Sequence, residues 1–349
     1  MDKISINYNP DYIKMPPPWW KRREVLIFVG AIILVGFITF KLGLAYNTIV
    51  VDNSDKEPWW KRAANVLPFV NGKVPEPTPD LNPLPEKESE RLDILMLGIR
   101  GEGDLANGGL LTDSIQVLSI NKSDKTVSII SLPRDLYIKV GDFEGKLNEV
   151  YERGLAKGDT FNYTKETISR LTGIYIDKMA VLDFEGFLGI IDKVGGIDVT
   201  LEKEFKETQQ WGYEFYLPEG ENHLEAQEAL YYVRSRYSTN DFDRSRRQQQ
   251  VLLATKDKVL SIGTLLNPIK LSGIISEFKD NLRTDISILN IGDMIDLLKS
   301  MSESLPETYV ISTENLLDQI VDDGVYKLLP KDGNYEGIKQ TFETILTKK

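Results

Sequence analysis

One long apolar run stands near the start of the chain. Residues 25–40 read VLIFVGAIILVGFITF without a charge, and LGLAY continues the run beyond Lys41 to Tyr46. A helix needs about 20 apolar residues to cross the hydrocarbon core of a bilayer, and the ammonium group of Lys41 can reach the headgroups. The pattern therefore predicts one transmembrane helix over residues 25–46.

The charges that flank this run predict its orientation. Lys21–Arg23 precede it, whereas Asp52, Asp55 and Glu57 follow it. Positive charge is enriched on the cytoplasmic side of membrane helices, so the tail over residues 1–24 is expected in the cytoplasm and the rest of the chain outside. A cleaved signal peptide is the alternative, but the run is long and no small-residue cleavage motif follows it.

Residues 47–90 predict a membrane-proximal segment and a linker. The pentapeptide PWWKR occurs at Pro18–Arg22 and again at Pro58–Arg62, on both sides of the apolar run. Paired tryptophans beside cations suit a membrane interface. Between Asn71 and Glu90 proline is too dense for a helix or a central strand, so this part is expected to be a stiff, extended spacer.

Short apolar runs alternate with amphipathic segments from residue 91 to residue 261. The expected strands are at residues 93–99, 114–120, 126–132 and 197–201, and the second and third of them form a hairpin. The expected helices are at residues 164–171, 184–194, 224–233 and 243–260. This order predicts a layered α/β or α+β domain with a central, mostly antiparallel sheet flanked by helices.

Residues 262–349 continue with helical patterns at 291–300 and 335–346 and extended runs at 308–313 and 324–330. No chemical motif appears in this part of the sequence. We interpret it as an extension packed on the same domain, and a separate small domain is the alternative.

The composition excludes several classes of function. The 53 acidic and 42 basic residues give a net charge of -11, which argues against a general nucleic-acid-binding protein, because such a protein needs a broad positive surface. The lack of cysteine excludes disulfides, thiolate catalysis and zinc–thiolate sites. The single histidine, His223, is interpreted as a surface residue, and a multi-histidine metal site is not expected.

Five arginines nevertheless fall in the short segment YVRSRYSTNDFDRSRRQQQ. They are Arg234, Arg236, Arg244, Arg246 and Arg247. Arginine suits phosphate, because its planar group donates paired hydrogen bonds and stays charged when partly buried. Arg234 and Arg236 would point the same way if the chain between them is extended. The cluster predicts a phosphate site, and a solvated basic face with salt bridges is the alternative.

The spacing in the second half of this segment predicts how its residues are presented. A helix that starts near residue 243 would place Arg244, Arg247 and Gln248 on one face. Asp241, just before the helix, would cap its first amide groups. The N-terminus of this helix would also attract an anion.

Polar residues at strand ends extend the predicted site. Arg134 and Asp135 follow a strand in SLPRDLYI, and Asp113 starts another strand in LLTDS, beside the glycine-rich loop 100–109. Side chains at strand ends often carry function in sheet-based domains. A carboxylate near a bound diphosphate is a typical ligand of Mg²⁺, so a Mg²⁺ site is expected there. Each of these segments is a weak signal when taken alone.

Six segments follow one another between Asp93 and Ser261: LLTDSIQVLSI, VSIISLPRDLYI, GKLNEVYERG, DFEGFLGIIDKVGGIDV, LEAQEALYYVRSR and DFDRSRRQQQV. Their order and spacing resemble the LytR-CpsA-Psr family of cell-wall phosphotransferases. The resemblance implies a catalytic LytR-CpsA-Psr domain over residues 91–261. It implies transfer of an anionic glycopolymer, such as a teichoic acid or capsular chain, from a polyprenyl diphosphate carrier to peptidoglycan. It also implies Mg²⁺ as cofactor and a hydrophobic groove for the lipid tail.

The resemblance also assigns roles to residues by position. The implied diphosphate-binding groups are Arg134, Arg234, Arg236, Arg244 and Gln248, with Arg247 and Lys146 as further candidates. The candidates for catalysis are Arg134, Asp135, Asp241 and Arg244. Asp113 is the implied Mg²⁺ ligand.

Two positions depart from the family pattern. The family commonly has an aspartate two residues after the glycine that ends the first strand, where this chain has Arg100. It commonly has an arginine two residues before Asp113, where this chain has Leu111. The usual second metal carboxylate is therefore missing. Asp104 or Glu102 in the adjacent loop would have to replace it, or the metal would be held more weakly.

The implied reaction is attack of a peptidoglycan sugar hydroxyl on the phosphorus nearer the polymer sugar, with polyprenyl phosphate as the leaving group. Arginines and Mg²⁺ would stabilise the developing negative charge. The candidate general bases are Asp113, Asp135 and Asp241. Two other functions stay open: a non-catalytic protein that binds lipid diphosphates or wall polymer, and a pyrophosphatase that uses water as the acceptor.

Overall fold

The structure is a computed structural model that describes residues 82–261, 280–286 and 306–347. The predicted transmembrane helix over residues 25–46, residues 47–81 of the predicted membrane-proximal segment and linker, and the predicted helix at 291–300 lie outside these residues. Within the described ranges, no helix combines the length and the apolar character needed to span a bilayer. The boundaries between the parts of the chain stay predictions.

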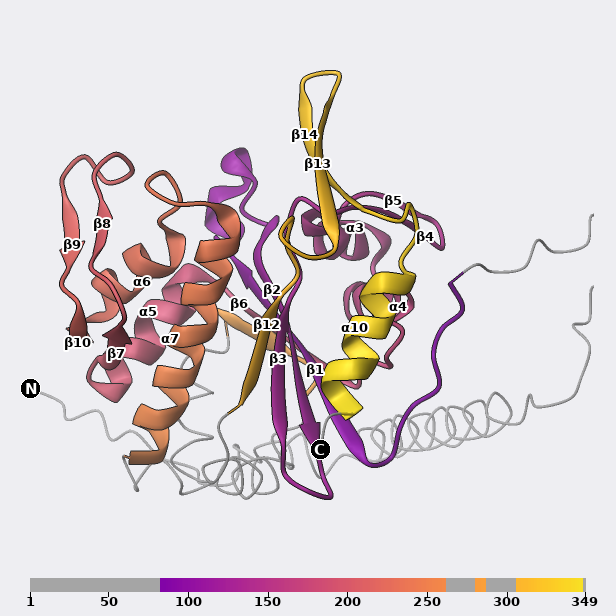
Figure 1. Ribbon diagram of the computed structural model, residues 1–349, viewed down its shortest axis with the longest axis horizontal. Helices are drawn as coiled ribbons and strands as arrows, with labels where there is room; N and C mark the ends of the chain where they lie inside the picture. The colour runs from indigo at the N-terminus through magenta and orange to yellow at the C-terminus, as the bar shows by residue number, and fades with distance from the viewer. Residues whose placement is uncertain (1–81, 262–279, 287–305, 348–349) are drawn as a thin grey trace, which may run out of the picture. The chain divides into compact units, whose positions relative to one another are not determined.

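A six-stranded sheet forms the centre of the fold (Figure 1). Across the sheet, the strands are β11 (Leu282–Thr284), β6 (Lys178–Leu182), β1 (Arg91–Ile99), β2 (Thr112–Asn121), β3 (Val127–Ser131) and β12 (Glu307–Val310). β1 runs parallel to β6 and β3 runs parallel to β12, whereas the other neighbours are antiparallel. The predicted hairpin of β2 and β3 is confirmed. The sheet is mixed, with three antiparallel and two parallel neighbouring pairs, so the predicted antiparallel majority holds; β6 runs parallel to β1 because the chain returns through the helices between β3 and β6.

Three helices cover one face of this sheet: α3 (Val150–Lys157), α4 (Thr160–Thr172) and α10 (Glu336–Thr347). Leu171 of α4 and Phe342 of α10 are fully buried in one core with Leu95 and Leu97 of β1. Side chains alternate between the two faces of a strand, so Met96 and Gly98 point to the opposite face. The helix predicted at residues 335–346 corresponds to α10.

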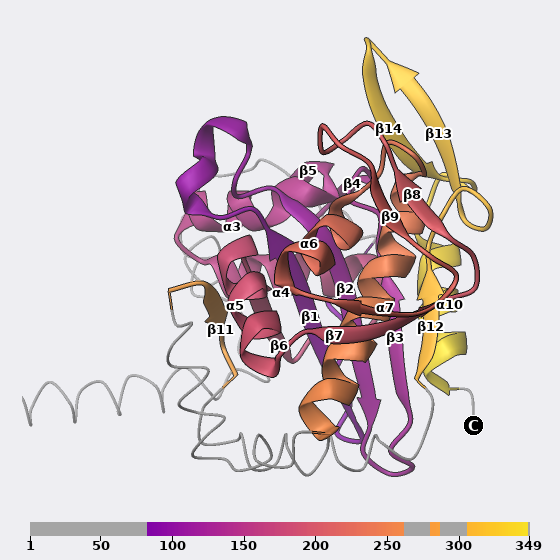
Figure 2. The ribbon, with the colours of Figure 1, turned by 90° about the vertical axis from the view of Figure 1, so that its left-hand side faces the viewer.

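The opposite face is covered by α5 (Phe184–Val194), α6 (Ala226–Arg234) and α7 (Asp241–Ser261), which lie in front of the sheet in Figure 2. Two small sheets adjoin these helices, one formed by β7 (Ile197–Leu201) and β10 (Gly220–Leu224), the other by β8 (Phe205–Glu207) and β9 (Phe215–Leu217). Their apolar side chains form a second core with the three helices. The sequence predicted α5, α6 and α7 with each end correct to within two residues.

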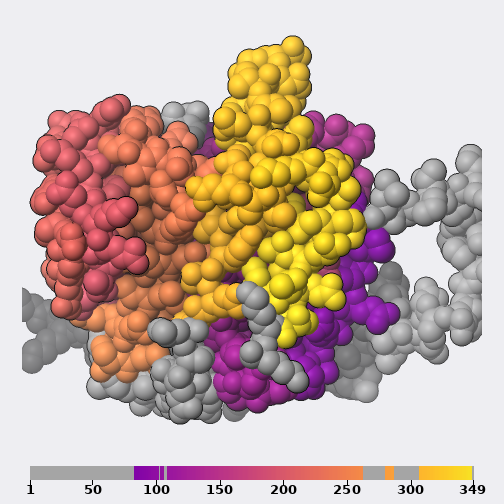
Figure 3. All heavy atoms as spheres, viewed as in Figure 1, coloured from indigo at the N-terminus to yellow at the C-terminus, as the bar shows by residue number. Residues whose placement is uncertain are grey.

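Two further hairpins extend from the ends of the sheet strands. β4 (Tyr137–Val140) and β5 (Phe143–Lys146) follow β3, and β13 (Leu317–Asp322) and β14 (Val325–Pro330) follow β12. Figure 3 shows the β13–β14 hairpin standing clear of the surface around it. The base of this hairpin is fixed to the segment after β3, since the amide of Leu328 donates to the carbonyl of Asp135 at 3.0 Å.

Candidate active site

One end of the central sheet collects the charged side chains that the sequence singled out. β1 and β3 end here and β2 begins here. Between β1 and β2 the register shifts, because Gly98 pairs with Ser114 whereas Ile99 pairs with Thr112. Asp113 is the extra residue of this β-bulge, and a bulge turns a side chain out of the regular alternation of a strand.

Three arginines meet at Asp113. Its Oδ1 accepts a hydrogen bond from Nη1 of Arg134, and its Oδ2 lies 3.6 Å from Nε of Arg100. Nη2 of Arg244 donates to the backbone carbonyl of Asp113 at 3.2 Å. Residues from the end of β1, the segment after β3 and the first turn of α7 therefore converge on one bulged residue.

The segment after β3 holds Arg134 and Asp135. Its backbone is fixed from two sides, because the amide of Asn148 donates to the carbonyl of Arg134 at 3.1 Å and β14 binds the carbonyl of Asp135. Nζ of Lys146, at the end of β5, lies 2.7 Å from Oδ1 of Asp135. The fold thus brings Arg134, Asp135 and Lys146 together, as the sequence predicted for candidates of one site.

α7 supplies Asp241 and Arg244 from its first turn. The prediction that Asp241 caps this helix was wrong, because Oδ1 of Asn240 accepts the amide of Asp243 at 2.8 Å and fills that role. Asp241 instead pairs with Nη2 of Arg244 at 2.8 Å. Burial raises the pKa of Asp241, against the opposing effects of Arg244 and Arg134. Burial also lowers the pKa of Arg244.

Two donors of this cluster have no acceptor among the described residues. Nε of Arg134 and Nε of Arg244 are buried without a hydrogen bond. Buried polar groups in proteins are nearly always hydrogen-bonded, so each exception needs an explanation. Both guanidinium groups contact carboxylates through their Nη atoms, and Nε of Arg134 lies 3.8 Å from Oδ2 of Asp135, beyond hydrogen-bond distance. Further acceptor oxygens, such as those of a phosphate, suit these donors.

Arg234 and Arg236 flank the cluster at the end of α6. The guanidinium group of Arg234 lies 4.3 Å from the ring centroid of Phe184 and 5.2 Å from that of Trp211. Burial lowers the pKa of Arg234, and the positive charge of Arg100 lowers it further. Arg236 is exposed. Arg234 is therefore partly enclosed by aromatic rings, whereas Arg236 is open to solvent.

Arg247 has a different environment from Arg244, although the sequence predicted one shared face. It is buried and donates to the carbonyls of Tyr232 and Ser235 and to Oγ1 of Thr239. Burial lowers its pKa to about 10. Arg247 therefore holds the loop that carries Arg236, and its predicted contact with a diphosphate stays a prediction.

Glu207 is a second support of this loop, and no motif in the sequence indicated it. The side chain at the end of β8 is fully buried. Oε1 accepts the amides of Gln209 and Gln210, and Oε2 accepts the amides of Tyr237 and Ser238. Burial alone would raise the pKa of Glu207, but these hydrogen bonds hold it below its usual value. An isolated glutamate in a short strand does not reveal such a role, because the two partners that it holds in this loop, Tyr237 and Ser238, are about 30 residues away in the chain.

Replacing Glu207 by glutamine is expected to lower the free energy of unfolding at pH 7 by about 3 kcal/mol, because an amide NH₂ would face backbone donors. The folded-state pKa is depressed, so the contribution of Glu207 is complete above its unfolded-state pKa of 4.5 and is lost as the pH falls through the lower folded-state value. Urea unfolding from pH 7 to pH 3 measures both effects. Glu214→Gln, which removes an exposed ion pair with Lys206, is the matched control and should change stability by less than about 1 kcal/mol. Equal stability loss in both variants would contradict the role of Glu207.

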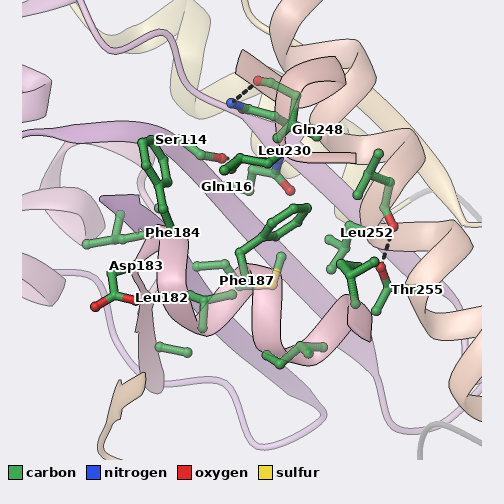
Figure 4. Close-up of a pocket in the computed structure, with 18 of the residues that line it drawn as sticks. Ser114, Gln116, Leu182, Asp183, Phe184, Phe187, Leu230, Gln248, Leu252 and Thr255 are labelled. Carbon is green, nitrogen blue, oxygen red and sulfur yellow. Dashed lines mark hydrogen bonds between the residues drawn. The ribbon is translucent and has the colours of Figure 1, made fainter. Parts of the chain in front are cut away.

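A cavity of about 300 Å³ lies between the sheet and the helices α5, α6 and α7 (Figure 4). Its walls are mostly apolar, and Figure 4 shows Phe187 of α5 pointing into it. Gln248 also lines the cavity and donates to the carbonyl of Val233 at 3.3 Å. Ser114, which follows Asp113, also lines the cavity. So does Phe184, whose ring packs against the guanidinium group of Arg234. The cavity therefore adjoins the arginine cluster.

The two predicted metal ligands, Asp113 and Asp104, are separated by a cation. Nε of Arg100 lies 3.6 Å from Asp113 Oδ2, and Nη1 lies 3.6 Å from Asp104 Oδ2. In the part of the chain that the structure describes, no group of three or more acidic, histidine or cysteine side chains is placed to hold a metal ion. Mg²⁺ needs a shell of oxygen ligands, but the carboxylate of Asp113 already faces two guanidinium groups. The side chains that the structure describes there do not fit a Mg²⁺ site, and the side chain of the alternative ligand Glu102 lies outside the described residues.

Comparison with known proteins identifies the family of the chain. The sequence model of the LytR_cpsA_psr family matches residues 67–343. The chain belongs to the LytR-CpsA-Psr family. The resemblance drawn from the six motifs is thereby confirmed, and the mixed sheet with its helices is the LytR-CpsA-Psr fold.

Other LytR-CpsA-Psr proteins show moderate similarity to this chain. It is 29% identical to the polyisoprenyl-teichoic acid–peptidoglycan teichoic acid transferase TagV of Bacillus subtilis, over 75% of this chain and 66% of that protein. It is 28% identical to the transferase TagU of Oceanobacillus iheyensis, over 77% of this chain and 79% of that protein. The crystal structure of B. subtilis TagV matches this structure with a TM-score of 0.57, covering 75% of this chain and 99% of the other.

Proposed function

We propose that this protein transfers an anionic glycopolymer, such as a teichoic acid, from a polyprenyl diphosphate carrier to peptidoglycan. The observation that carries the proposal is the junction between the arginine cluster and the apolar cavity at Phe184. A lipid diphosphate has a charged head and a long apolar tail, and this junction offers one environment for each. The names of the relatives TagV and TagU as teichoic acid transferases support the same substrate class.

The reaction follows from the charges around Asp113. The oxygen of an acceptor hydroxyl attacks the phosphorus nearer the polymer sugar and forms a new P–O bond. The bond from that phosphorus to the bridging oxygen breaks, and polyprenyl phosphate leaves. Arg134 and Arg244 would stabilise the charge that develops on the phosphoryl oxygens, because preorganised guanidinium groups need no rearrangement during the reaction.

Asp241 is the candidate that best fits the general base. Asp113 accepts a hydrogen bond from Arg134, and Asp135 accepts one from Lys146, so a cation of the site already engages each of these carboxylates. Burial instead raises the pKa of Asp241. A carboxylate with a raised pKa accepts a proton from a hydroxyl more readily. The hydroxyl proton would therefore pass to Asp241.

The full chain in detergent tests this function with a synthetic polyprenyl diphosphate disaccharide and a peptidoglycan oligomer. We expect release of polyprenyl phosphate together with a phosphodiester-linked product, both detected by mass spectrometry. Release of polyprenyl phosphate without that product would instead indicate a pyrophosphatase. Binding without release would indicate the non-catalytic alternative.

We further propose that residues 25–46 anchor the chain in the cell membrane, with residues 1–24 in the cytoplasm and the domain outside. The apolar run and the charges around it support this topology. Protease added to protoplasts, which are cells freed of their wall with an intact membrane, should degrade the domain. Protection of the domain would contradict the proposal.

Replacing Phe187 by aspartate should remove the preference for long lipid tails. A charged side chain in the cavity opposes burial of the apolar lipid tail, so kcat/KM for a long-tailed substrate should fall at least about 10-fold. A short-tailed diphosphate substrate should be affected much less, because its tail does not fill the cavity. Phe187→Leu keeps the wall apolar and is the control. Equal losses for both substrates would place the lipid tail elsewhere.

A further inference from the structure

Arg100 lies between the two predicted metal ligands, Asp104 and Asp113. The proposed reaction gives it no role. We propose that its guanidinium group supplies the positive charge that a divalent cation would otherwise supply at Asp113, so that this site acts on a diphosphate without a bound metal ion. The inference rests on the proposed function for its substrate. It concerns the electrostatics of the site itself.

The position of Arg100 is fixed by the backbone on both sides. It directly follows β1, and the amide of the next residue, Gly101, donates a hydrogen bond to the carbonyl of Gly109 at 3.0 Å. This bond closes the glycine-rich loop on itself. A Cβ atom at Gly109 would lie 2.1 Å from the carbonyl oxygen of Gly101, so the closed loop requires glycine there. The guanidinium group of Arg100 is thereby held between Asp104 and Asp113.

Arg100 also remains able to contact a ligand. Its side chain is 34% exposed, compared with 18% for Arg134 and 5% for Arg244. It lies close enough to Arg234 to lower the pKa of that residue, after the larger effect of burial. Two like charges held this close are stabilised by an anion that both can bind. The same anion would therefore contact Arg100 and Arg234.

The charge balance of the site favours an anion without an added cation. Asp104, Asp113, Asp135 and Asp241 each have a cationic partner, and Arg234 and Arg236 form no ion pair with these four carboxylates among the side chains that the structure describes. A diphosphate diester carries one negative charge on each phosphate, so these two arginines balance it. A bound Mg²⁺ would double the positive excess and would have to displace Arg100 from both carboxylates.

A guanidinium group and Mg²⁺ differ in ways that can be measured. Arg100 cannot be removed by a chelator, and it does not bring coordinated water to the phosphate. Arg100→Asp would place a third carboxylate between Asp104 and Asp113, which is a ligand set that suits a divalent cation. The substitution should therefore convert a site without metal into a metal site.

The test uses the full chain in detergent, with Mn²⁺ as a paramagnetic probe. For the unchanged protein, electron paramagnetic resonance should detect no bound Mn²⁺ up to about 1 mM, and EDTA should leave transfer unchanged within about twofold. Arg100→Asp should bind Mn²⁺ and should transfer only when Mg²⁺ is present. Arg100→Ala should lower kcat/KM about 100-fold in both conditions. Arg246→Ala, which removes an exposed arginine paired with Asp243 and Glu314, should match the unchanged protein.

Binding of Mn²⁺ by the unchanged protein, reversed by EDTA, would overturn the inference, as would loss of transfer in EDTA that Mg²⁺ restores. The Mn²⁺ measurement does not depend on turnover. If no variant transfers under any condition, the proposed function fails, and the Mn²⁺ spectra of the unchanged protein and of Arg100→Asp still decide whether Arg100 replaces a metal ion.

Discussion

Replacing Arg244 by alanine is expected to lower kcat/KM for polymer transfer by about 100- to 1000-fold. Arg244 contacts Asp113 and Asp241 at once, and its Nε is buried without an acceptor among the described residues. The substitution therefore removes a positioned donor from the place where charge develops on the phosphoryl oxygens. Steady-state release of polyprenyl phosphate measures the loss.

Two further variants in α7 test whether the loss of activity is specific to the guanidinium group of Arg244. Arg244→Lys keeps a positive charge but not the planar group, so it should recover only a small part of the activity. Arg246→Ala removes an arginine from the exposed side of α7 and should leave kcat/KM unchanged. If Arg244→Ala and Arg246→Ala behaved alike, the charge cluster at Asp113 would not be the reaction site.

Replacing Asp241 by asparagine is expected to lower kcat by about 100- to 10,000-fold, with a smaller change in KM. The carboxylate must be deprotonated to accept the hydroxyl proton. Because burial raises its pKa, the rate of the unchanged protein should rise with pH through a value above 3.8, the ordinary pKa of an aspartate. This loss of rate at low pH, the acidic limb of the pH profile, should be absent from the residual rate of Asp241→Asn. The pH dependence of kcat for both proteins is the measurement.

Asp243→Asn is the matched control, since Asp243 lies on the same turn and pairs with the exposed Arg246. It should keep the full rate and the same pH dependence. An unchanged acidic limb in Asp241→Asn would assign proton transfer to another group, and Asp135 would then be the next candidate.

The local elements of this fold could be predicted from sequence, because their hydrophobic periodicity is determined by near neighbours. α5 and β7 were predicted with their observed bounds. The long-range arrangement could not be predicted in the same way. β6 and β12 join the sheet by pairing with β1 and β3 over large separations in the chain, and no local pattern specifies these partners.

In the candidate site too, contacts between residues close in sequence could be predicted, whereas contacts that depend on long-range packing could not. Arg134, Asp135 and Lys146 are brought together as expected, since the β4–β5 hairpin and the segment before it are close in sequence. Arg244 and Arg247 are both buried on one helix but contact different neighbours, because Arg247 faces the carbonyl of Tyr232 in α6 whereas Arg244 faces Asp113. The cap at Asn240 was missed because Asp241 is an equally suitable residue type by propensity.

The bulge at Asp113 lies between the paired strands β1 and β2 and the loop that connects them. Gly98 pairs with Ser114 below the bulge, so the two strands are already in register where the loop between Ile99 and Thr112 begins. Insertions or deletions in that loop can therefore be accommodated without shifting the strands or the segment that carries Arg134. In evolutionary terms, the residues beside Asp113 form an exchangeable part of the site, and loops that carry a cation or a carboxylate can be grafted onto the same sheet.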